Sequence, residues 1–204
     1  MSHSPALAPA TGDTPDQRRR LILLAGATGG VGLAAVAVPF LSSLQPSERA
    51  RAAGASVEVD IGDIAPGATK VVAWRGQPVW IMRRTPQMLA ALAGLDAKLA
   101  DPDSRQHQQP DYARNAQRSI HPEVFVGIGI CTHLGCSPGE VAAGSNNQSV
   151  GDDWQGGFFC PCHGSTFDLA GRVYKNKPAP TNLEVPPHRY LSASKLLIGE
   201  DAAV

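Results

Sequence analysis

A run of 24 residues without a charge, Leu21 to Leu44, constrains this chain more than any other feature. As an α-helix it would measure roughly 36 Å, which exceeds the hydrocarbon core of a bilayer at about 30 Å. The basic cluster Arg18-Arg19-Arg20 stands directly before it, and such clusters stay on the cytoplasmic side of a membrane. We therefore expect a transmembrane anchor helix over residues 21–44, with a cytoplasmic tail over residues 1–20.

This segment has two other interpretations. A buried core helix would rarely stand unbroken beside the N-terminus and behind three arginines. A cleaved export signal usually has a shorter apolar stretch, and no clear cleavage site of small residues precedes Glu48-Arg49. The sequence Arg18-Arg19-Arg20-Leu21-Ile22 does resemble a twin-arginine signal, which exports proteins after they have folded. An uncleaved anchor on an exported protein is therefore the favoured interpretation.

Composition limits what the remainder can be. The 18 basic residues are balanced by 18 acidic ones and only 5% of residues are aromatic, so neither a basic surface nor a stacking platform for nucleic acid is indicated. The polar residues 45–56 show no hydrophobic period and are expected to form a flexible hinge linker. With 21 Gly and 17 Pro, the chain favours a turn-rich β domain, which we place at residues 57–204.

Apolar alternation predicts the elements of this domain. Strands are expected at residues 56–61, 70–74, 78–83, 124–130, 158–159, 183–185, 189–191 and 195–198. Pro86 favours a helix start, and Met88, Leu92, Leu95 and Leu99 would give that helix one apolar face up to Asp101. Residues 101–119 are polar and expected to pack on the surface, and residues 139–157 are expected to be rich in turns.

All four cysteines of the chain fall in two short boxes with one histidine each. The boxes read Cys131-Thr132-His133-Leu134-Gly135-Cys136 and Cys160-Pro161-Cys162-His163-Gly164-Ser165. Two thiolates and two imidazoles make a tetrahedral zinc site, so a structural zinc module is one interpretation. That interpretation leaves two cysteines without a role, although an exported chain can pair surplus cysteines in a disulfide.

The two boxes resemble those of the Rieske iron–sulfur proteins, in which two His replace two Cys on one iron of a 2Fe–2S cluster. The resemblance continues through Asp168, Gly171-Arg172 and Pro178-Ala179-Pro180, and the order of signal, anchor, linker and β domain also matches. It points to the iron–sulfur subunits of bacterial quinol–cytochrome c reductases, the cytochrome bc complexes. It implies a mainly β fold: antiparallel strands with a small rubredoxin-like, cluster-binding subdomain inserted at about residues 127–181.

The resemblance also implies roles for seven residues of the boxes. Cys131 and Cys160 would bind the buried iron of one 2Fe–2S cluster, His133 and His163 would bind the outer iron, Cys136 and Cys162 would form a disulfide, and Ser165 would donate a hydrogen bond to a cluster sulfur. Leu134, Pro161 and the segment 178–180 would form an apolar collar. His133 and His163 would carry the chemistry, with His163 accepting a proton from quinol. The other histidines, His3, His107, His121 and His188, are expected to be solvated.

For a member of this family, one electron passes from quinol to the cluster and then to a c-type cytochrome, which contributes to proton translocation. The expected partners are a cytochrome b subunit, a c-type cytochrome subunit, quinol and membrane lipid, within a dimeric complex. The anchor would lie in the bacterial inner membrane, with the C-terminal domain in the periplasm.

Three alternatives differ in testable ways. An exported Rieske subunit of a periplasmic oxidoreductase such as arsenite oxidase would purify with a molybdenum subunit. A soluble Rieske ferredoxin would lack the anchor. A zinc module would give no electron paramagnetic resonance signal after reduction.

Two positions depart from the family pattern. Phe167 stands where the members of highest potential carry a Tyr whose hydroxyl bonds a ligand sulfur, which should lower the potential here. Lys177 stands where many relatives have Gly.

Overall fold

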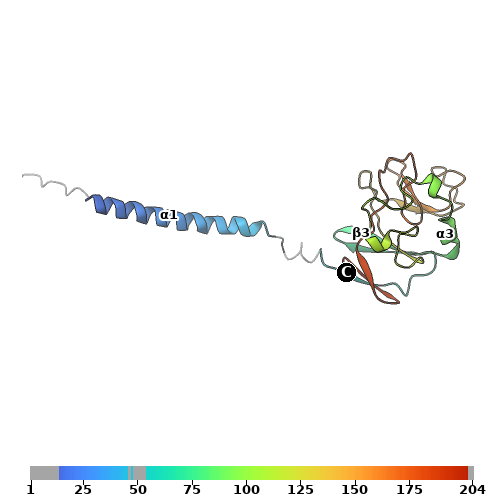
Figure 1. Ribbon diagram of the computed structural model, residues 1–204, viewed down its shortest axis with the longest axis horizontal. Coiled ribbons are helices and arrows are strands. Elements are labelled where there is room, and N and C mark those ends of the chain that lie inside the picture. The colour runs from blue at the N-terminus through green and yellow to red at the C-terminus, as the bar shows by residue number, and fades with distance from the viewer. Residues whose placement is uncertain (1–13, 46, 48–53, 202–204) are drawn as a thin grey trace, which may run out of the picture. The chain divides into compact units, whose positions relative to one another are not determined.

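The computed structural model describes residues 14–45, 47 and 54–201 of the chain (Figure 1). It divides into two compact units, residues 1–50 and residues 51–204. The predicted cytoplasmic tail therefore lies largely outside the described residues, as does most of the predicted hinge at residues 45–56. The N-terminal helix and the β domain are described separately below.

The described part of the N-terminal unit forms one helix, α1 (Pro15–Ser43). It begins at Pro15, whose fixed φ angle suits the first helical position, and so includes the three arginines ahead of the apolar run. This 29-residue helix is long and apolar enough to cross a membrane. None of its residues is buried, and its large apolar side chains are exposed.

The second unit is built from three antiparallel sheets of three strands each. The first has the order β1 (Val57–Asp60), β9 (Lys195–Ile198), β8 (His188–Ser192). The second has the order β2 (Thr69–Trp74), β3 (Gln77–Arg83), β4 (Val124–Ile128). The third has the order β5 (Gly139–Val141), β6 (Gly157–Phe159), β7 (Thr166–Phe167) and lies within the range in which the cluster-binding subdomain is expected. The predicted fold class, an apolar N-terminal helix and an antiparallel β domain, is confirmed.

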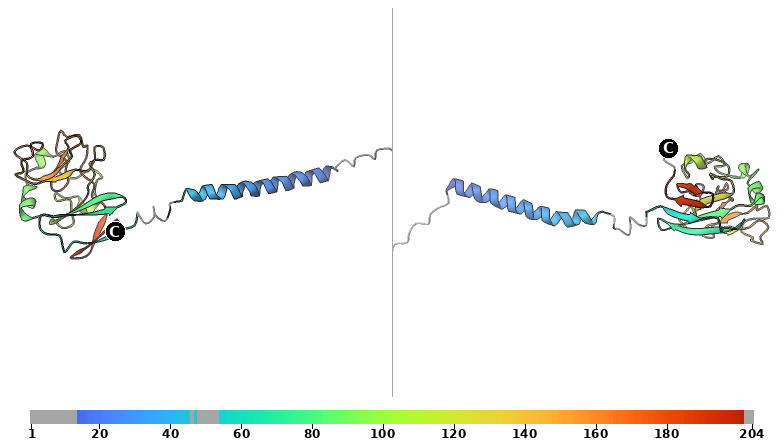
Figure 2. Two further views of the ribbon diagram at one scale, coloured as in Figure 1. Left: turned by 180° about the vertical axis from the view of Figure 1, so that it is seen from behind. Right: turned by 90° about the horizontal axis from the view of Figure 1, so that it is seen from below.

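The middle sheet separates two hydrophobic cores. Successive residues of a strand point to opposite faces, and four consecutive residues of β3 are buried, so both faces of this strand are covered. Val79 and Ile81 pack against the first sheet in a core that we call the base core. Trp80 and Met82 pack on the other side, in a core that also holds Cys131 and Cys160 and that we call the site core. Figure 2 shows β8 and β9 stacked over the β2–β3 hairpin in its right-hand view.

The β2–β3 hairpin follows the sequence prediction. Trp74 pairs with Gln77, so only Arg75 and Gly76 form the turn. Both have positive φ, at 51° and 75°, which is the two-residue turn whose twist matches that of antiparallel strands. Strands β1, β4, β6, β8 and β9 also lie where alternation predicts them.

The helix expected from Pro86 to Leu99 is shorter than predicted. Helix α3 spans Pro86–Ala91, Gly94 then has a φ of +79°, and a 3-10 turn follows at Asp96–Lys98. Gly94 adopts this left-handed conformation easily and ends the helical path. Leu92, Leu95 and Leu99 are nevertheless all buried. The spacing of these leucines therefore predicted their burial correctly. The continuous helix that the same spacing predicted is not present.

The segment 139–157 is rich in turns over residues 142–156, as expected, and its first three residues form β5, which pairs with β6. Two further expectations are wrong. Residues 183–185 form no strand, because their backbone bonds to both Ile128 and Gln108 in an irregular path. The segment 101–119, with a 3-10 turn at Asp111–Ala113, packs into the domain: Arg118 and Ala113 are fully buried. Its buried polar groups form hydrogen bonds with backbone carbonyls inside the protein. Because their hydrogen-bonding groups have partners, they can be buried without a large cost.

Candidate metal centre

Two loops of the same backbone design carry the two boxes. In the first, the Cys131 N–H donates to the Cys136 carbonyl (2.7 Å), and the Gly135 N–H donates to the Cys131 carbonyl (3.0 Å). The second loop repeats both bonds at the equivalent positions, from Cys160 to Ser165 (2.8 Å) and from Gly164 to Cys160 (3.0 Å). The glycine of each loop has a positive φ, +83° and +77°, which lets the chain close so tightly.

A disulfide joins the two loops. Cys136 and Cys162 are bonded, with their Cα atoms 6.6 Å apart and a sequence separation of 26. The expected pairing is confirmed. Because each cysteine belongs to one box, the bond fixes the distance between the two loops.

The other two cysteines are free thiols on the inner side of the loops. Cys131 and Cys160 are each 2% exposed and pack in the site core with Phe158 and Phe167. Burial raises the pKa of the Cys131 thiol, and the neighbouring Cys160 acts in the same direction. Hydrogen bonds from the His133 backbone N–H and from the Ser165 side chain act against this rise in pKa. The site thus places two thiols together beside donors that stabilise a thiolate.

The two imidazoles lie together on the outer side. The ring centroids of His133 and His163 are 4.7 Å apart, and their planes are nearly perpendicular. Nδ1 of His133 is buried and has no hydrogen-bond partner, whereas the side chain of His163 is exposed. A buried ring nitrogen requires a partner, and a metal ion is a partner that imidazole accepts.

The donor set fits a cluster with mixed ligands. The Sγ atoms of Cys136, Cys160 and Cys162 lie within 4.8 Å of one another, but two of these atoms are bonded in the disulfide and are not free to bind metal. The available donors are therefore the thiols of Cys131 and Cys160 and the imidazoles of His133 and His163. Two thiolates and two imidazoles are the ligands that a Rieske-type cluster requires.

A segment after the second box is attached to both loops. The Ala179 N–H donates to Oγ of Ser165 (3.0 Å), and Oγ1 of Thr132 donates to the Thr181 carbonyl (2.7 Å). Ser165, singled out in the sequence, is fully buried beside Cys131, while Leu134 is 70% exposed. The role of Thr132 was not predicted, although a hydroxyl between two ligand positions of a box could have suggested a loop contact.

Two other features of the domain were also missed. Three arginines are buried behind the site, as described below, and His188 is 1% exposed rather than solvated. Nδ1 of His188 lies 2.8 Å from the Pro186 carbonyl, and its backbone N–H donates to the Tyr112 hydroxyl (2.7 Å). These bonds satisfy the groups that burial removes from water.

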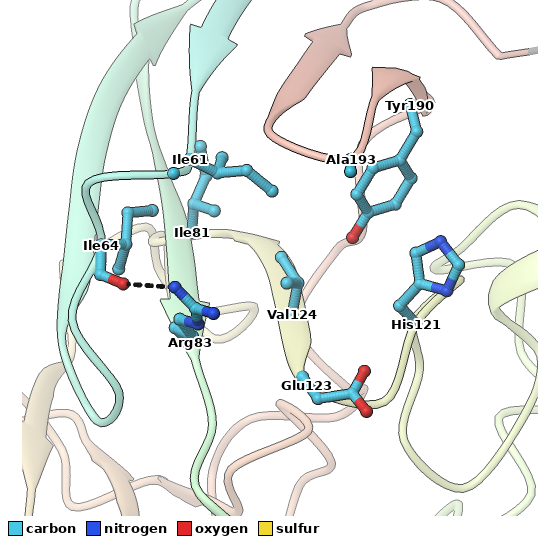
Figure 3. Close-up of a pocket in the computed structure, with 10 residues that line it drawn as sticks. Ile61, Ile64, Ile81, Arg83, His121, Glu123, Val124, Tyr190 and Ala193 are labelled. Atoms are coloured by element: carbon cyan, nitrogen blue, oxygen red, sulfur yellow. Dashed lines mark hydrogen bonds between the residues drawn. The ribbon is translucent and has the colours of Figure 1, made fainter.

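A cavity of about 370 Å³ opens at the edge of the base core, away from the two loops (Figure 3). Ile61 and Ile81 are among the residues that line it, and Arg83 donates to the carbonyl of the adjacent Ile64 (3.0 Å) on one side of the cavity. It contains none of the residues singled out in the sequence as ligands. The candidate site is therefore the exposed tip formed by the two loops.

Known proteins resemble the chain over nearly all its length. Residues 103–187 match the family model of the Rieske [2Fe-2S] domain, and residues 7–47 match that of the ubiquinol–cytochrome c reductase Fe–S subunit TAT signal. The ubiquinol–cytochrome c reductase iron–sulfur subunit of Allochromatium vinosum is 55% identical over 192 residues, covering 94% of this chain and 92% of that protein. The proteins of the same name from Bradyrhizobium diazoefficiens and Blastochloris viridis are 41% and 40% identical, covering 93% and 95% of this chain and 98% and 99% of theirs. With the two equivalent loops and the disulfide between them, these matches show that the chain belongs to the family of ubiquinol–cytochrome c reductase iron–sulfur subunits.

Proposed function

We propose that this chain is the Rieske 2Fe–2S subunit of a cytochrome bc complex, which takes one electron and a proton from quinol and passes the electron to a c-type cytochrome. The observation that carries the proposal is the convergence of two buried thiols and two imidazoles from two equivalent, disulfide-linked loops. A zinc module needs the four donors but has no need of an exposed imidazole such as that of His163. The arrangement suits a centre that must exchange electrons at the protein surface.

In this proposal Cys131 and Cys160 are the inner ligands and His133 and His163 the outer ones. A Rieske cluster supplies one-electron transfer at roughly −150 to +300 mV, well above the potential of about −400 mV for plant-type ferredoxins with four Cys ligands. Burial of the two thiols in the site core keeps water from the sulfur side. The buried Nδ1 of His133 is the nitrogen positioned to coordinate, which leaves its other ring nitrogen for hydrogen bonding.

The proton is assigned to His163. Its ring is exposed at the tip, so the nitrogen that does not bind metal can accept a hydrogen bond from a quinol hydroxyl and hold the proton. Exposed Leu134 and Pro161 flank the imidazoles from the two loops and give the quinol an apolar surface to meet. Because reduction takes up a proton, the midpoint potential should fall as pH rises wherever reduction is coupled to that uptake.

The partners and the location follow from the same assignment. The chain would assemble with a cytochrome b subunit and a c-type cytochrome subunit in a dimeric complex, within membrane lipid. Residues 1–20 would be cytoplasmic, residues 21–44 would cross the inner membrane, residues 45–56 would act as the hinge, and residues 57–204 would lie in the periplasm. The apolar α1 and the match of residues 7–47 to an export signal support this arrangement.

The decisive test is purification of the tagged full-length chain from its native membrane in mild detergent. We expect b-type and c-type haems to purify with it, together with quinol–cytochrome c reductase activity. Replacement of His163 by Asn should abolish that activity, whereas His107→Asn, at an exposed position outside the boxes, should retain it. Purification with a molybdenum subunit and no haem would overturn the proposal in favour of an exported oxidoreductase.

A further inference from the structure

Three arginine side chains lie inside the domain on the far side of the site core. Arg84, Arg118 and Arg172 are 2%, 0% and 1% exposed. A buried guanidinium normally has a carboxylate partner, because removing its charge from water costs several kcal/mol. The partners of these three arginines therefore show whether the charge is balanced.

Only Arg172 is paired with a buried carboxylate. Its Nε donates to Oδ2 of Asp168 at 2.7 Å, and Asp168 is itself fully buried. Across the described part of the chain, neither Arg84 nor Arg118 makes an ion pair, and Nε of Arg118 has no hydrogen-bond partner. The buried carboxylate of Asp101 accepts hydrogen bonds from the backbone N–H groups of residues 105 and 106. The charge of Asp168 acts on both arginines, that of Asp101 acts on Arg118 and that of Glu123 acts on Arg84, but none of them forms an ion pair with either arginine.

Instead, these two arginines bind three consecutive carbonyls of the loop that follows β7. Arg84 donates to the Leu169 carbonyl (3.2 Å), and Arg118 donates to those of Ala170 (3.2 Å) and Gly171 (3.3 Å). Arg118 also donates to the Leu183 carbonyl (2.7 Å). Carbonyl dipoles solvate a cation but do not cancel its charge. Burial lowers the pKa of both arginines to about 10, so both remain charged at neutral pH.

Apolar material lies between these charges and the thiols. The side chains of Leu169, Ala170 and Leu183 belong to the same site core as Cys131 and Cys160. The rest of this core includes three phenylalanines that are at most 1% exposed: Phe125, Phe158 and Phe167. The Arg84 guanidinium lies over the Phe125 ring, 5.6 Å from its centroid. Because such an apolar region contains little that can screen a charge, we expect a change of charge at either arginine to alter the electrostatic potential at the cysteines.

We propose that Arg84 and Arg118 are fixed positive charges that raise the reduction potential of the cluster bound at the two loops. The inference rests on the proposed function, because it needs a cluster at Cys131, His133, Cys160 and His163. Reduction adds one negative charge there, and a nearby cation stabilises the reduced state more than the oxidised state. The two residues touch neither cluster nor substrate; they act through the field and by holding the 169–171 loop.

The test compares charge with structure at the same positions, in the full-length, cluster-loaded protein in detergent. Arg84→Met and Arg118→Met remove the charge, whereas Arg84→Lys and Arg118→Lys keep it but lose most of the carbonyl bonds. Redox titration should show a lower reduction potential for each Met variant. We expect the equilibrium constant for reduction to fall by a factor of about three or more, which corresponds to ~28 mV at ~59 mV per tenfold change. The Lys variants should stay closer to wild type, even where urea unfolding shows them destabilised.

A matched control lies on the same segment as Arg118. Arg114 is exposed and forms an ion pair with Asp111 (2.9 Å), so Arg114→Met should leave the potential unchanged. If each Lys variant shifts the potential as much as its Met counterpart, the effect is structural and the charge proposal is wrong. If the Met variants leave the potential unchanged, it is also wrong.

A further variant covers the case in which the Met variants do not fold. Oε1 of the half-buried Gln109 accepts a hydrogen bond from Arg118 (2.9 Å), so Gln109→Glu places a negative charge beside the guanidinium and leaves the arginine present. The potential should fall here too, and an unchanged potential would contradict the proposal. Absence of a cluster from the wild-type protein would instead refute the proposed function, so the two failures are distinguishable.

Discussion

The base of the domain and its loop region are stabilised in different ways. Strands of the first two sheets have four to seven residues and enclose the base core, with Val79, Ile81 and Ile198 fully buried. Strands of the third sheet have only two or three residues. The loops beside this short sheet are fixed by a disulfide, by buried arginines and by the Ser165 and Thr132 hydrogen bonds.

This difference follows from what each region has to expose. A loop that presents two imidazoles to a partner cannot bury them, so it cannot be stabilised mainly by apolar area. Covalent and polar links can fix such a loop without covering its tip. The base has no such demand and is stabilised mainly by apolar burial. The following predictions test this contrast between the two regions, from the largest expected effect to the smallest.

Removal of the disulfide should have the largest effect. Cys136→Ser leaves all four proposed ligands in place but frees the two loops to separate. A closed loop of this length contributes about 3–4 kcal/mol in the chain-entropy model. We expect poor cluster assembly and a lowered potential, measured by iron content and redox titration. Full iron content with an unchanged potential in this variant would show that the bond does not organise the site.

A cavity in the base should affect stability without affecting the site. Ile81 is fully buried in the base core, on the face of β3 that points away from the thiols. Ile81→Ala should lower the free energy of unfolding by about 2–4 kcal/mol in urea titrations. The redox potential of the folded fraction should match that of the wild type. A shift in potential as large as that of Cys136→Ser would mean that the two regions are not separate.

Hydrogen bonding at the thiols should tune the potential by smaller amounts. Ser165 is buried and hydrogen-bonded to Cys131, and Phe167 is buried in the site core without a polar group. A hydrogen bond to a charged acceptor contributes about 1.5–3 kcal/mol, and only its difference between redox states enters the potential. Ser165→Ala should lower the potential, and Phe167→Tyr should raise it, each by about half to all of a ~59 mV step.

The Tyr variant carries its own check. If a crystal structure of Phe167→Tyr places the new hydroxyl within hydrogen-bond reach of a ligand sulfur while the potential is unchanged, hydrogen bonding does not set the potential at this site.

Acidification should destabilise the domain modestly through His188. Burial lowers the pKa of this imidazole, so the unfolded chain takes up a proton before the folded protein does. Stability is therefore complete above the unfolded pKa of about 6.5 and is lost as pH falls below it. One proton limits the loss to about 1.4 kcal/mol per pH unit. Urea unfolding at several pH values should show this slope in wild type and lose it in His188→Gln. An equal slope in both proteins would assign the effect to other groups.

The features of the fold and the site that could be predicted from the sequence are those determined by contacts between residues close together in the chain. The disulfide between the two boxes and the β2–β3 hairpin were predictable, because the residues that determine them stand in short, recognisable stretches of sequence. Arg118 and His188 were not, because each is buried by partners supplied from elsewhere in the fold: the carbonyls of Ala170 and Leu183 for Arg118, and the Tyr112 hydroxyl for His188. Nothing in the sequence next to either residue indicates those partners.

The Leu92–Leu99 spacing shows the same limit in another form. Leucines spaced three and four residues apart indicate which side chains face the core. They do not show that Gly94, which has a positive φ, interrupts the helical backbone between Leu92 and Leu95. Burial was therefore predicted better than secondary structure at these positions.

The most direct test of the account is pulsed electron paramagnetic resonance of the reduced full-length protein. Nuclear modulation by nitrogen reports which imidazoles bind the spin-coupled iron pair. We predict coupling to two distinct imidazole nitrogens in wild type, and loss of that two-nitrogen pattern in both His133→Cys and His163→Cys, while His107→Asn leaves it unchanged. A reduced cluster with no strongly coupled imidazole nitrogen, or a wild-type pattern in either Cys variant, would contradict the ligand set on which the whole account rests.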